Sequence, residues 1–386
     1  MKNKLVKKAV AVIILVAVLV VMLQLQKDVN VCERIATTLS RAWIYIFGNL
    51  FGFLPFSVYE VFLVAAIVFA VTSVVLIIVH LCKKRGAKAL SLLLTVAITA
   101  LSVVNVYSLS ASFAYNRQPL PKDIYTTYKS DDFSYDQAVD MAEKVVNKLN
   151  AAYNQIERDS EGHVVMPSQK QLNALLAKEF ERLPSEYFSS YTPVSKTIAN
   201  KTIMSELHIV GVFFAPFGEA NINGFETGLY LPHTMAHEMA HGKGVMRENE
   251  ANLVASYLLL TSDNPYLSYS GLVKTFYSAL SLVSLYPDSQ ADYARLYASV
   301  DRGVLKDMSD YSKFWSRFTL LDDIGNWLND IYLKLNKQTG SDSYYKPSQS
   351  EGTGKKDNDG QEILRIINFS DTQNLLVGLY KKGFLS

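Results

Sequence analysis

The stretch 231–252 reads LPHTMAHEMAHGKGVMRENEAN and contains the pattern H-E-x-x-H. Its two histidines, His237 and His241, are four residues apart, so on a helix they lie one turn apart on the same face. Both imidazoles can then bind one Zn²⁺ ion at about 2.0–2.1 Å. Glu238 projects from the same turn, where a carboxylate can accept a proton from an activated water. The spacing therefore predicts a zinc site with Glu238 as general base.

The residues around the motif favour a buried helix. Pro232 suits a first helical position. Met235 and Met239 are apolar and compatible with a helix, and Gly242 and Gly244 follow where a left-handed helix end is expected. A buried helix with several inward polar side chains requires a reason, and a metal ion supplies one.

A catalytic zinc ion usually has three protein ligands, so the motif needs a third. His233 lies eight residues before His241, or about 12 Å along a helix, which is too far for one ion. Glu248 and Glu250 remain, at the start of a second helix after the Gly-x-Gly turn.

The faces of this second helix distinguish the two glutamates. Glu248 shares its face with Ala251, Asn252 and Ala255, whose small alanines allow close approach to the first helix, whereas Glu250 shares its face with larger apolar residues. We therefore expect Glu248 as the third ligand and keep Glu250 as the alternative. Asn252, one turn below Glu248, is expected to accept the second ring N–H of a ligand histidine and fix its tautomer.

The pattern E-x-x-A-[ND] after H-E-x-x-H resembles the gluzincin zinc peptidases. A closer resemblance covers most of the chain, to an uncharacterised family of bacterial membrane proteins, domain of unknown function 3810. It rests on the stretches 55–60 (PFSVYE), 115–117 (YNR), 216–223 (PFGEANIN) and 247–252 (RENEAN). The junction 115–117 departs from the family's order, with Tyr before Asn. The resemblance implies a zinc-peptidase-like fold and brings no substrate.

Composition points to a membrane protein rather than to a nucleic-acid-binding one. The 386 residues are 49% hydrophobic and carry a net charge of only +2. A weak net charge gives no sign of a nucleic-acid partner, and the chain contains no glycine-rich nucleotide-binding loop. The two cysteines, Cys32 and Cys82, fall on opposite sides of the membrane in the topology below, so no disulfide is expected.

Three uncharged runs in the first 115 residues are long enough to cross about 30 Å of hydrocarbon: 9–25, 61–81 and 89–111. Lysines and arginines precede the first run and fill the loop between the second and third. The positive-inside rule places both basic segments in the cytoplasm. We therefore expect a multi-pass protein of the cell membrane, with the remainder of the chain outside.

The segment 31–47 lies between the first two spans and has a roughly helical apolar stripe. It is expected either to lie in the membrane interface or to pack on the spans. With it, residues 1–115 form the predicted membrane domain, and residues 116–338 form a predicted extracytoplasmic zincin-like domain.

One strand region precedes the metal helix, at 208–223. Its edge could hold an extended peptide by strand addition. Glu219, Asn221 and Asn223 alternate on one face. They either line the substrate cleft or form an ordinary solvated strand face.

The end of the chain is expected to contain a flexible segment at 339–360, rich in Gly, Ser, Lys and Asp, and a helical segment at 361–386 that packs on the peptidase domain. Tyr344 or Tyr345 could hydrogen-bond a reaction oxyanion, as tyrosines do in related enzymes.

The expected fold is α+β and mostly α, with N-terminal transmembrane helices followed by a gluzincin-type soluble domain containing a small sheet. The expected function is that of a membrane-anchored zinc metallopeptidase, whose partners are a peptide or protein substrate and the lipid bilayer. The alternative is a non-catalytic zinc-binding membrane sensor or scaffold. Intramembrane proteolysis is disfavoured because charged residues crowd the motif's flank: Lys243, Arg247, Glu248 and Glu250.

Overall fold

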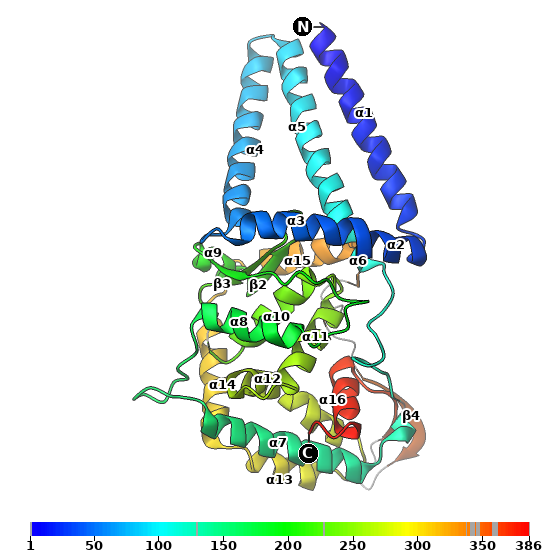
Figure 1. The fold of residues 1–386 in the computed structure, drawn as a ribbon, viewed down its shortest axis with the longest axis vertical. Helices are drawn as coiled ribbons and strands as arrows, with labels where there is room; N and C mark the ends of the chain where they lie inside the picture. Colours follow the sequence, from blue (N-terminus) through cyan, green and yellow to red (C-terminus); the bar gives the residue numbers. More distant parts are fainter. Residues whose placement is uncertain are drawn as a thin grey trace.

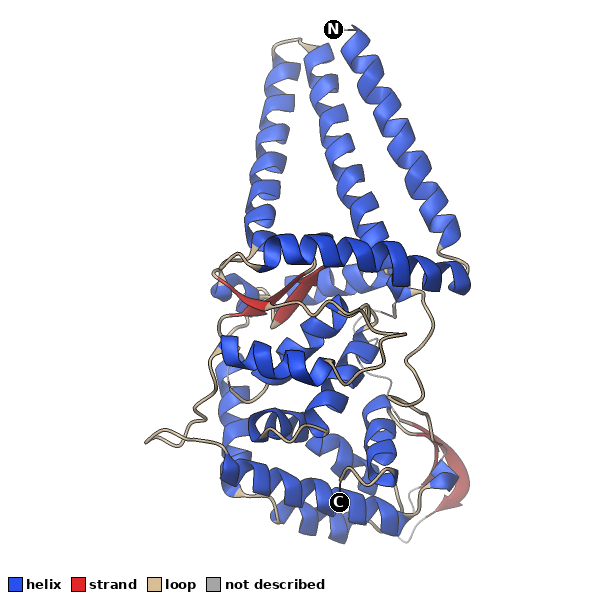
Figure 2. Cartoon of the chain, viewed as in Figure 1, coloured by secondary structure: helices blue, strands red, loops and turns tan. Residues whose placement is uncertain are grey.

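The computed structural model describes residues 2–128, 130–226, 228–336, 338–339, 344, 348–356 and 362–385. Three long helices project from one end of a mostly helical body, and a further helix runs across their base (Figure 1). The body contains a small three-stranded sheet on the side nearest the long helices, with the remaining helices stacked beyond it (Figure 2). The predicted fold class, mostly helical with a small sheet and apolar N-terminal helices, is confirmed.

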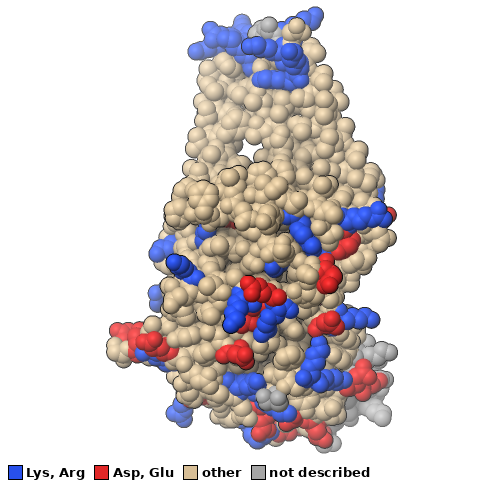
Figure 3. Space-filling model, in the orientation of Figure 1, with Lys and Arg blue, Asp and Glu red and all other residues tan. Residues whose placement is uncertain are grey.

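The long helices are α1 (Lys2–Leu25), α4 (Val58–Cys82) and α5 (Gly86–Tyr107), which continues through η2 (Ser108–Ser112) and α6 (Phe113–Tyr115). By length and composition each can cross a membrane, and their apolar side chains face outward. Ser57 caps the start of α4 by accepting from the Glu60 N–H. Lys and Arg side chains gather at the far tips of the three helices (Figure 3).

The segment between the first two spans is helical throughout and forms α2 (Val29–Ile35), η1 (Ala36–Ser40) and α3 (Arg41–Gly52). α3 lies across the base of the spans (Figure 1) and packs against η4 (Ala215–Phe217). Trp43 Nε1 donates to the Pro216 carbonyl at 3.0 Å. Gly218 follows η4 with φ +62°, and a Cβ there would lie 2.7 Å from the Ile44 carbonyl oxygen, so only glycine permits this close approach.

The sheet has the strand order β1-β3-β2, with β1 (Ser195–Ile198), β2 (Gly211–Phe214) and β3 (Glu219–Asn223). β1 is parallel to β3, which places Thr197 opposite Ile222, and β2 is antiparallel to β3. The crossover from β1 to β2 contains α9 (Lys201–Glu206). This order leaves β2 at an edge of the sheet.

The body packs around an apolar core made by residues between 120 and 385, with helices from α7 (Tyr135–Gln155) to α16 (Asp371–Lys381). Ser134 and Gln137 form a capping box at the start of the longest of them, and apolar residues at helical spacing bury its inner face, which favours the packed helix over an isolated one. The helices of the body are α7 (Tyr135–Gln155), α8 (Gln169–Phe180), α10 (Leu231–Gly242), α11 (Glu248–Leu260), α12 (Pro265–Ser284), α13 (Gln290–Ala298), α14 (Arg302–Trp315), α15 (Asp322–Leu335) and α16 (Asp371–Lys381).

The segment 339–360, expected to be flexible, lies partly outside the described residues. Within its described part, Gln349–Lys356 forms strand β4, which pairs antiparallel with β5 (Glu362–Asn368). The predicted helical segment 361–386 is only partly helical, because Glu362–Asn368 pairs with β4 as a strand, and Asp371–Lys381 forms α16, which contacts α7, α11 and α12.

Candidate metal centre

Two adjacent helices, α10 and α11, bring His237, His241 and Glu248 together in the interior. His241 Nε2 lies 3.2 Å from His237 Nε2, which lies 3.1 Å from Glu248 Oε2. Ligand atoms held at about 2.0–2.1 Å around a tetrahedral ion are themselves about 3.3 Å apart. The three side chains therefore fit a divalent ion such as zinc, and we call them the metal group.

The other ring nitrogen of each histidine is already engaged. His237 Nδ1 lies 2.9 Å from Asn252 Oδ1, and His241 Nδ1 lies 2.7 Å from the Val245 carbonyl oxygen. Both acceptors require an N–H at Nδ1, which leaves the Nε2 lone pairs free to face the same point. The structure thus places Asn252 in the orienting position that the sequence suggested.

Charge within the metal group is set by opposing effects. Burial raises the pKa of Glu248, but the charges and hydrogen bonds of His241 and His237 outweigh it and lower the pKa to about 2. Burial disfavours the charged form of His241, yet Glu248 raises its pKa to about 9. The carboxylate is therefore ionised at neutral pH, as a metal ligand must be.

Glu238 lies beside the metal group and against the edge strand. It is only 5% exposed, and burial raises the pKa of its carboxyl group. A Cβ at Gly211 of β2 would lie 2.5 Å from Glu238 Oε1, so the strand can approach this carboxylate only through a glycine. A carboxyl group with a raised pKa beside a metal group is suited to accept and return a proton.

The free edge of β2 runs over Glu238. The Asn223 N–H donates to the Val210 carbonyl at 2.9 Å, so in this antiparallel pair the hydrogen-bonded positions are those of Val210, Val212 and Phe214. The backbone groups of Gly211 and Phe213 therefore point away from β3, and on this side the Phe213 N–H donates to the Glu238 carboxylate. An extended peptide could add to this edge, next to the metal group.

The alternative ligands lie elsewhere. Glu250 pairs with Arg247, with 3.1 Å between Oε2 and Nε, and lies outside the metal group. His233 is buried, and its Nε2 lies 3.1 Å from Ser256 Oγ. It borders a cavity of about 240 Å³, together with Asn252 and Lys274.

Glu219, Asn221 and Asn223 are buried and engaged with the fold rather than lining a cleft beside the ligands. Glu219 accepts from the Val58 and Tyr59 N–H groups at 3.1 and 2.8 Å, and so binds the start of α4. Asn221 Nδ2 donates to the Glu219 carbonyl at 3.2 Å, and Asn223 Nδ2 donates to Ser205 Oγ at 2.9 Å. These contacts explain why the alternating polar residues do not form a solvated strand face either.

Tyrosines near Glu248 were not singled out by the sequence. The hydroxyls of Tyr115 and Tyr332 lie 2.9 Å apart, and the charge of Glu248 acts on Tyr332. Of the tyrosines suggested by the sequence, Tyr344 donates to Asn329 Oδ1 at 3.0 Å, and its carbonyl accepts from Asn252 Nδ2 at 3.2 Å. Tyr345 lies outside the described residues.

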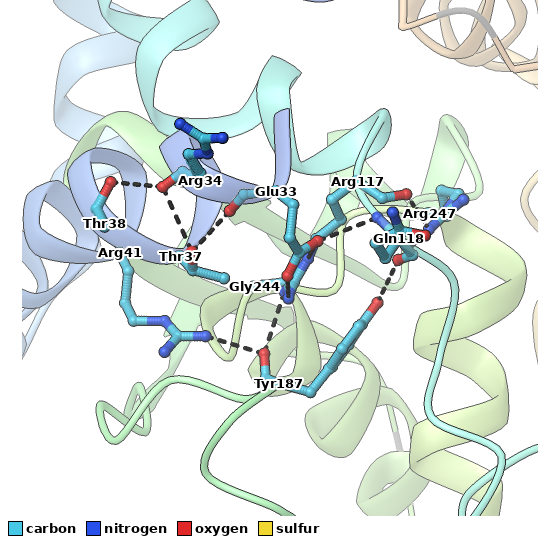
Figure 4. Close-up of polar contacts among 10 residues, drawn as sticks. All are labelled: Glu33, Arg34, Thr37, Thr38, Arg41, Arg117, Gln118, Tyr187, Gly244 and Arg247. Carbon is cyan, nitrogen blue, oxygen red and sulfur yellow. Dashed lines mark hydrogen bonds and ion pairs between the residues drawn. The ribbon is translucent and has the colours of Figure 1, made fainter. Parts of the chain in front are cut away.

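The turn between the two ligand helices is held by the segment that follows α6 (Figure 4). Arg117 is 2% exposed and binds both carboxylate oxygens of Glu33, at 3.0 and 2.6 Å. Its Nη1 donates to the carbonyls of Tyr187 and Gly244, at 3.2 and 3.3 Å. Arg247 Nη2 donates back to the Arg117 carbonyl at 2.9 Å. We call Glu33, Arg117, Tyr187 and Arg247 the loop clamp.

The loop clamp could not be inferred from local sequence. Arg117 and Glu33 are 84 positions apart, and Arg117 and Gly244 are 127 apart. The junction 115–117 was noted only as part of a resemblance. Its arginine directly precedes Gln118, whose carbonyl also accepts from Arg247, at 2.8 Å.

Comparison with known proteins identifies the family of this chain. The family described as "Protein of unknown function (DUF3810)" matches residues 36–347, which include α4, α5, the sheet and the whole metal group. No curated protein and no solved structure matches. Because the match covers most of the 386 residues, the chain belongs to the DUF3810 family.

Proposed function

We propose that this protein is a membrane-anchored zinc metallopeptidase. The observation that carries the proposal is the buried metal group with Glu238 beside it, below the open edge of β2. His237, His241 and Glu248 would hold the ion. When bound, zinc supplies Lewis-acid activation of a water molecule and of the scissile carbonyl.

The chain's own residues account for the remaining tasks. Glu238 accepts a proton from the attacking water and returns it to the leaving nitrogen, a role favoured by its raised pKa. Asn252 and the Val245 carbonyl hold the two imidazoles in one tautomer. The backbone groups of Gly211, which point away from β3, bind the substrate main chain as part of an added strand.

A purely structural zinc site explains these features less well. A structural site is usually closed by four protein ligands, whereas the metal group offers three. Nor does a structural site need a buried carboxyl group next to the ion. A non-catalytic sensor or scaffold remains the second candidate, and the experiment below separates the two.

The test uses the full chain purified in detergent. Zinc content by elemental analysis should be one ion per wild-type chain, should be lost in His237→Ala and Glu248→Ala, and should persist in Glu250→Ala. Glu238→Gln should keep the zinc and lose cleavage of a peptide library, read by mass spectrometry, by a factor of about 10² or more. A Glu238→Gln protein that cleaves at the wild-type rate would refute the mechanism. A zinc-loaded wild type that cleaves no peptide would favour the sensor or scaffold.

We also propose that the body lies on the extracytoplasmic side of the cell membrane. The basic tips of α1 and of the α4–α5 loop are at the far end from the body (Figure 3), and basic loops stay in the cytoplasm. Cys82 is exposed at that tip and Cys32 is buried. A membrane-impermeant maleimide should therefore label the protein only after cells are permeabilised. Labelling of Cys82 in intact cells would reverse the orientation.

A further inference from the structure

Helix α15 has three distinct faces, of which one packs on the body. Gly325 lies against α9, since a Cβ there would be 2.4 Å from the Leu207 carbonyl oxygen. Leu333 and Asn336 are buried on the same side. This face fixes α15 firmly to the protein, so the other two faces have defined directions.

The second face is apolar and open. Its members within the helix follow the spacing i, i+3, i+4, i+7 and i+11, which marks one side of a helix, and Leu320 lies just before the helix begins. Each is between 38% and 81% exposed. An apolar row of this length at the surface marks a site of interaction rather than ordinary surface. We call this row the α15 stripe: Leu320, Ile324, Trp327, Leu328, Ile331 and Leu335.

The third face is polar and carries no excess of positive charge. It contains Asp323, Asn326, Asp330 and Lys334. A protein partner recognised by charge, or an anionic lipid headgroup, would find little attraction here. Whatever covers the stripe is therefore bound through its apolar side chains.

The position of α15 indicates what that partner is. At one end, Tyr107 of the span α5 donates to the Tyr332 hydroxyl and to Asn336 Oδ1, both at 3.2 Å. At the other end, His208 Nε2 lies 2.6 Å from Asp322 Oδ1, which ties the helix start to the loop after α9. α15 thus lies at the level where the spans enter the body (Figure 1).

The stripe lies nearer to this span than the polar face does. At about 100° per residue, Tyr332 is about 20° from Gly325 and about 40° from Leu328 around the helix axis but about 160° from Lys334. Tyr332, which meets Tyr107, therefore lies at the border between the packed face and the stripe, and the polar face turns away from the span. The stripe is thus exposed beside the end of α5.

From this placement, we propose that the α15 stripe inserts into the surface of the bilayer that the spans cross. α15 is then an in-plane anchor, with Trp327 at the boundary between headgroups and acyl chains, where aromatic residues are favoured. The inference is independent of any catalytic activity. This insertion would also bring the metal group close to the lipid surface. Tyr332 of α15 hydrogen-bonds Tyr115, and both burial and the charge of Glu248 raise the pKa of Tyr332.

Spin labels on the full chain in phosphatidylcholine nanodiscs test the proposal. Leu328→Cys and Ile324→Cys place a label on the stripe, and Asp323→Cys and Asn326→Cys place matched labels on the polar face of the same helix. All four are made in a Cys82→Ser background, since Cys32 is buried. The positions are exposed, so folding should be retained in every variant.

The stripe labels should collide several-fold more with oxygen, which partitions into lipid, than with a water-soluble nickel complex, and the polar-face labels should show the reverse. Equal access of the nickel complex to both faces would overturn the proposal. Exclusion of both reagents from the stripe would also overturn it, in favour of a covering protein surface such as a second copy of the chain.

Discussion

Two buried ion pairs connect the membrane segments to the body, and they differ in what they hold. Arg117 and Glu33 meet at 2.6 Å next to the metal-ligand turn, whereas Lys196 and Glu219 meet at 2.6 Å under the start of α4. The Lys196–Glu219 pair is buried on both sides, while Glu33 is partly exposed. Arg117 and Glu33 are 84 positions apart, whereas Lys196 and Glu219 are 23 apart, on paired strands.

The choice of cation matches the task. The planar guanidinium of Arg117 binds two carboxylate oxygens and still reaches the Gly244 carbonyl, so it fixes the direction of the ligand turn. The Lys196 ammonium donates to the carbonyls of Phe51 and Phe56, at 2.8 and 3.1 Å. Phe51 lies at the end of α3, and Phe56 lies just before α4. The first pair therefore acts on the metal group, and the second anchors a span.

The largest expected effect follows from breaking the anchoring pair. Glu219→Gln leaves the buried Lys196 ammonium without its counter-charge and should cost about 3–5 kcal/mol of unfolding free energy. Denaturant unfolding in detergent micelles measures this loss, and the zinc content of the folded fraction should not change. Asp140→Asn, which breaks the exposed pair with Lys144, is the control and should shift stability by no more than about 0.5 kcal/mol. An equally small shift for Glu219→Gln would show that the buried pair anchors nothing.

The next largest effect is expected on the affinity of the metal group for zinc. Asn252→Ala removes the acceptor from His237 Nδ1 and should lower zinc affinity by about 10–100-fold, since orienting partners of metal ligands have effects of this size. Competition with a chromophoric chelator gives the affinity. Asn249→Ala is matched on the same helix, because its side chain bonds Asp371 instead, at 2.8 Å. If both variants bind zinc alike, the orienting role of Asn252 is disproved.

A smaller effect is expected when the loop clamp is loosened. Glu33→Gln keeps the shape of the side chain and removes the charge opposite Arg117, which should cost about 1–2 kcal/mol of stability. Zinc affinity should fall several-fold, because the Gly244 turn sets the distance between His241 and Glu248. The same chelator competition measures this change. The comparison between the two pairs fails if Glu219→Gln weakens zinc binding and Glu33→Gln does not.

Glu226 is another buried carboxyl group, and its hydrogen-bond partner is a tyrosine hydroxyl instead of a cation. Both of its oxygens accept from Tyr311 at 3.1 Å. Burial raises the pKa of Glu226 to about 8, although Tyr311 and the charge of Lys274 oppose this. Because the folded state keeps a proton that the unfolded chain has released, this contribution to stability is complete below about pH 4.5 and is lost as the pH rises toward 8.

The expected slope between pH 6 and pH 7 is a loss of about 1.4 kcal/mol from this one group. Unfolding experiments on the wild type and Glu226→Gln at a series of pH values measure how stability changes with pH. The loss of stability due to Glu226 between pH 6 and pH 7 should be absent from the variant. A wild type and a variant with parallel pH profiles would show that Glu226 ionises normally in the folded protein.

Sequence patterns predicted the features that depend on nearby residues. The spans follow from uninterrupted apolar runs, and His237 and His241 follow from a four-residue spacing on one helix. The face argument also chose Glu248, which the structure brings into the metal group, over Glu250, which pairs with Arg247.

The features that depend on distant partners could not be predicted in this way. Alternation placed Glu219, Asn221 and Asn223 on one strand face, but nothing local showed that Glu219 would bind the backbone of Val58, 161 positions away. The amphipathic pattern of α15 is present in the sequence, yet only the contact of Tyr332 with Tyr107 shows that this helix lies beside the end of α5.

The loop clamp also has a consequence for biosynthesis. Chains are made from the N-terminus, so Glu33 and the three spans leave the ribosome before Arg117, and Arg117 leaves before any residue of the metal group. The ligand turn is therefore made after the segment that supports it. Any fault in placing the segment that carries Glu33, which lies between two helices able to cross a membrane, therefore removes support from the ligand turn.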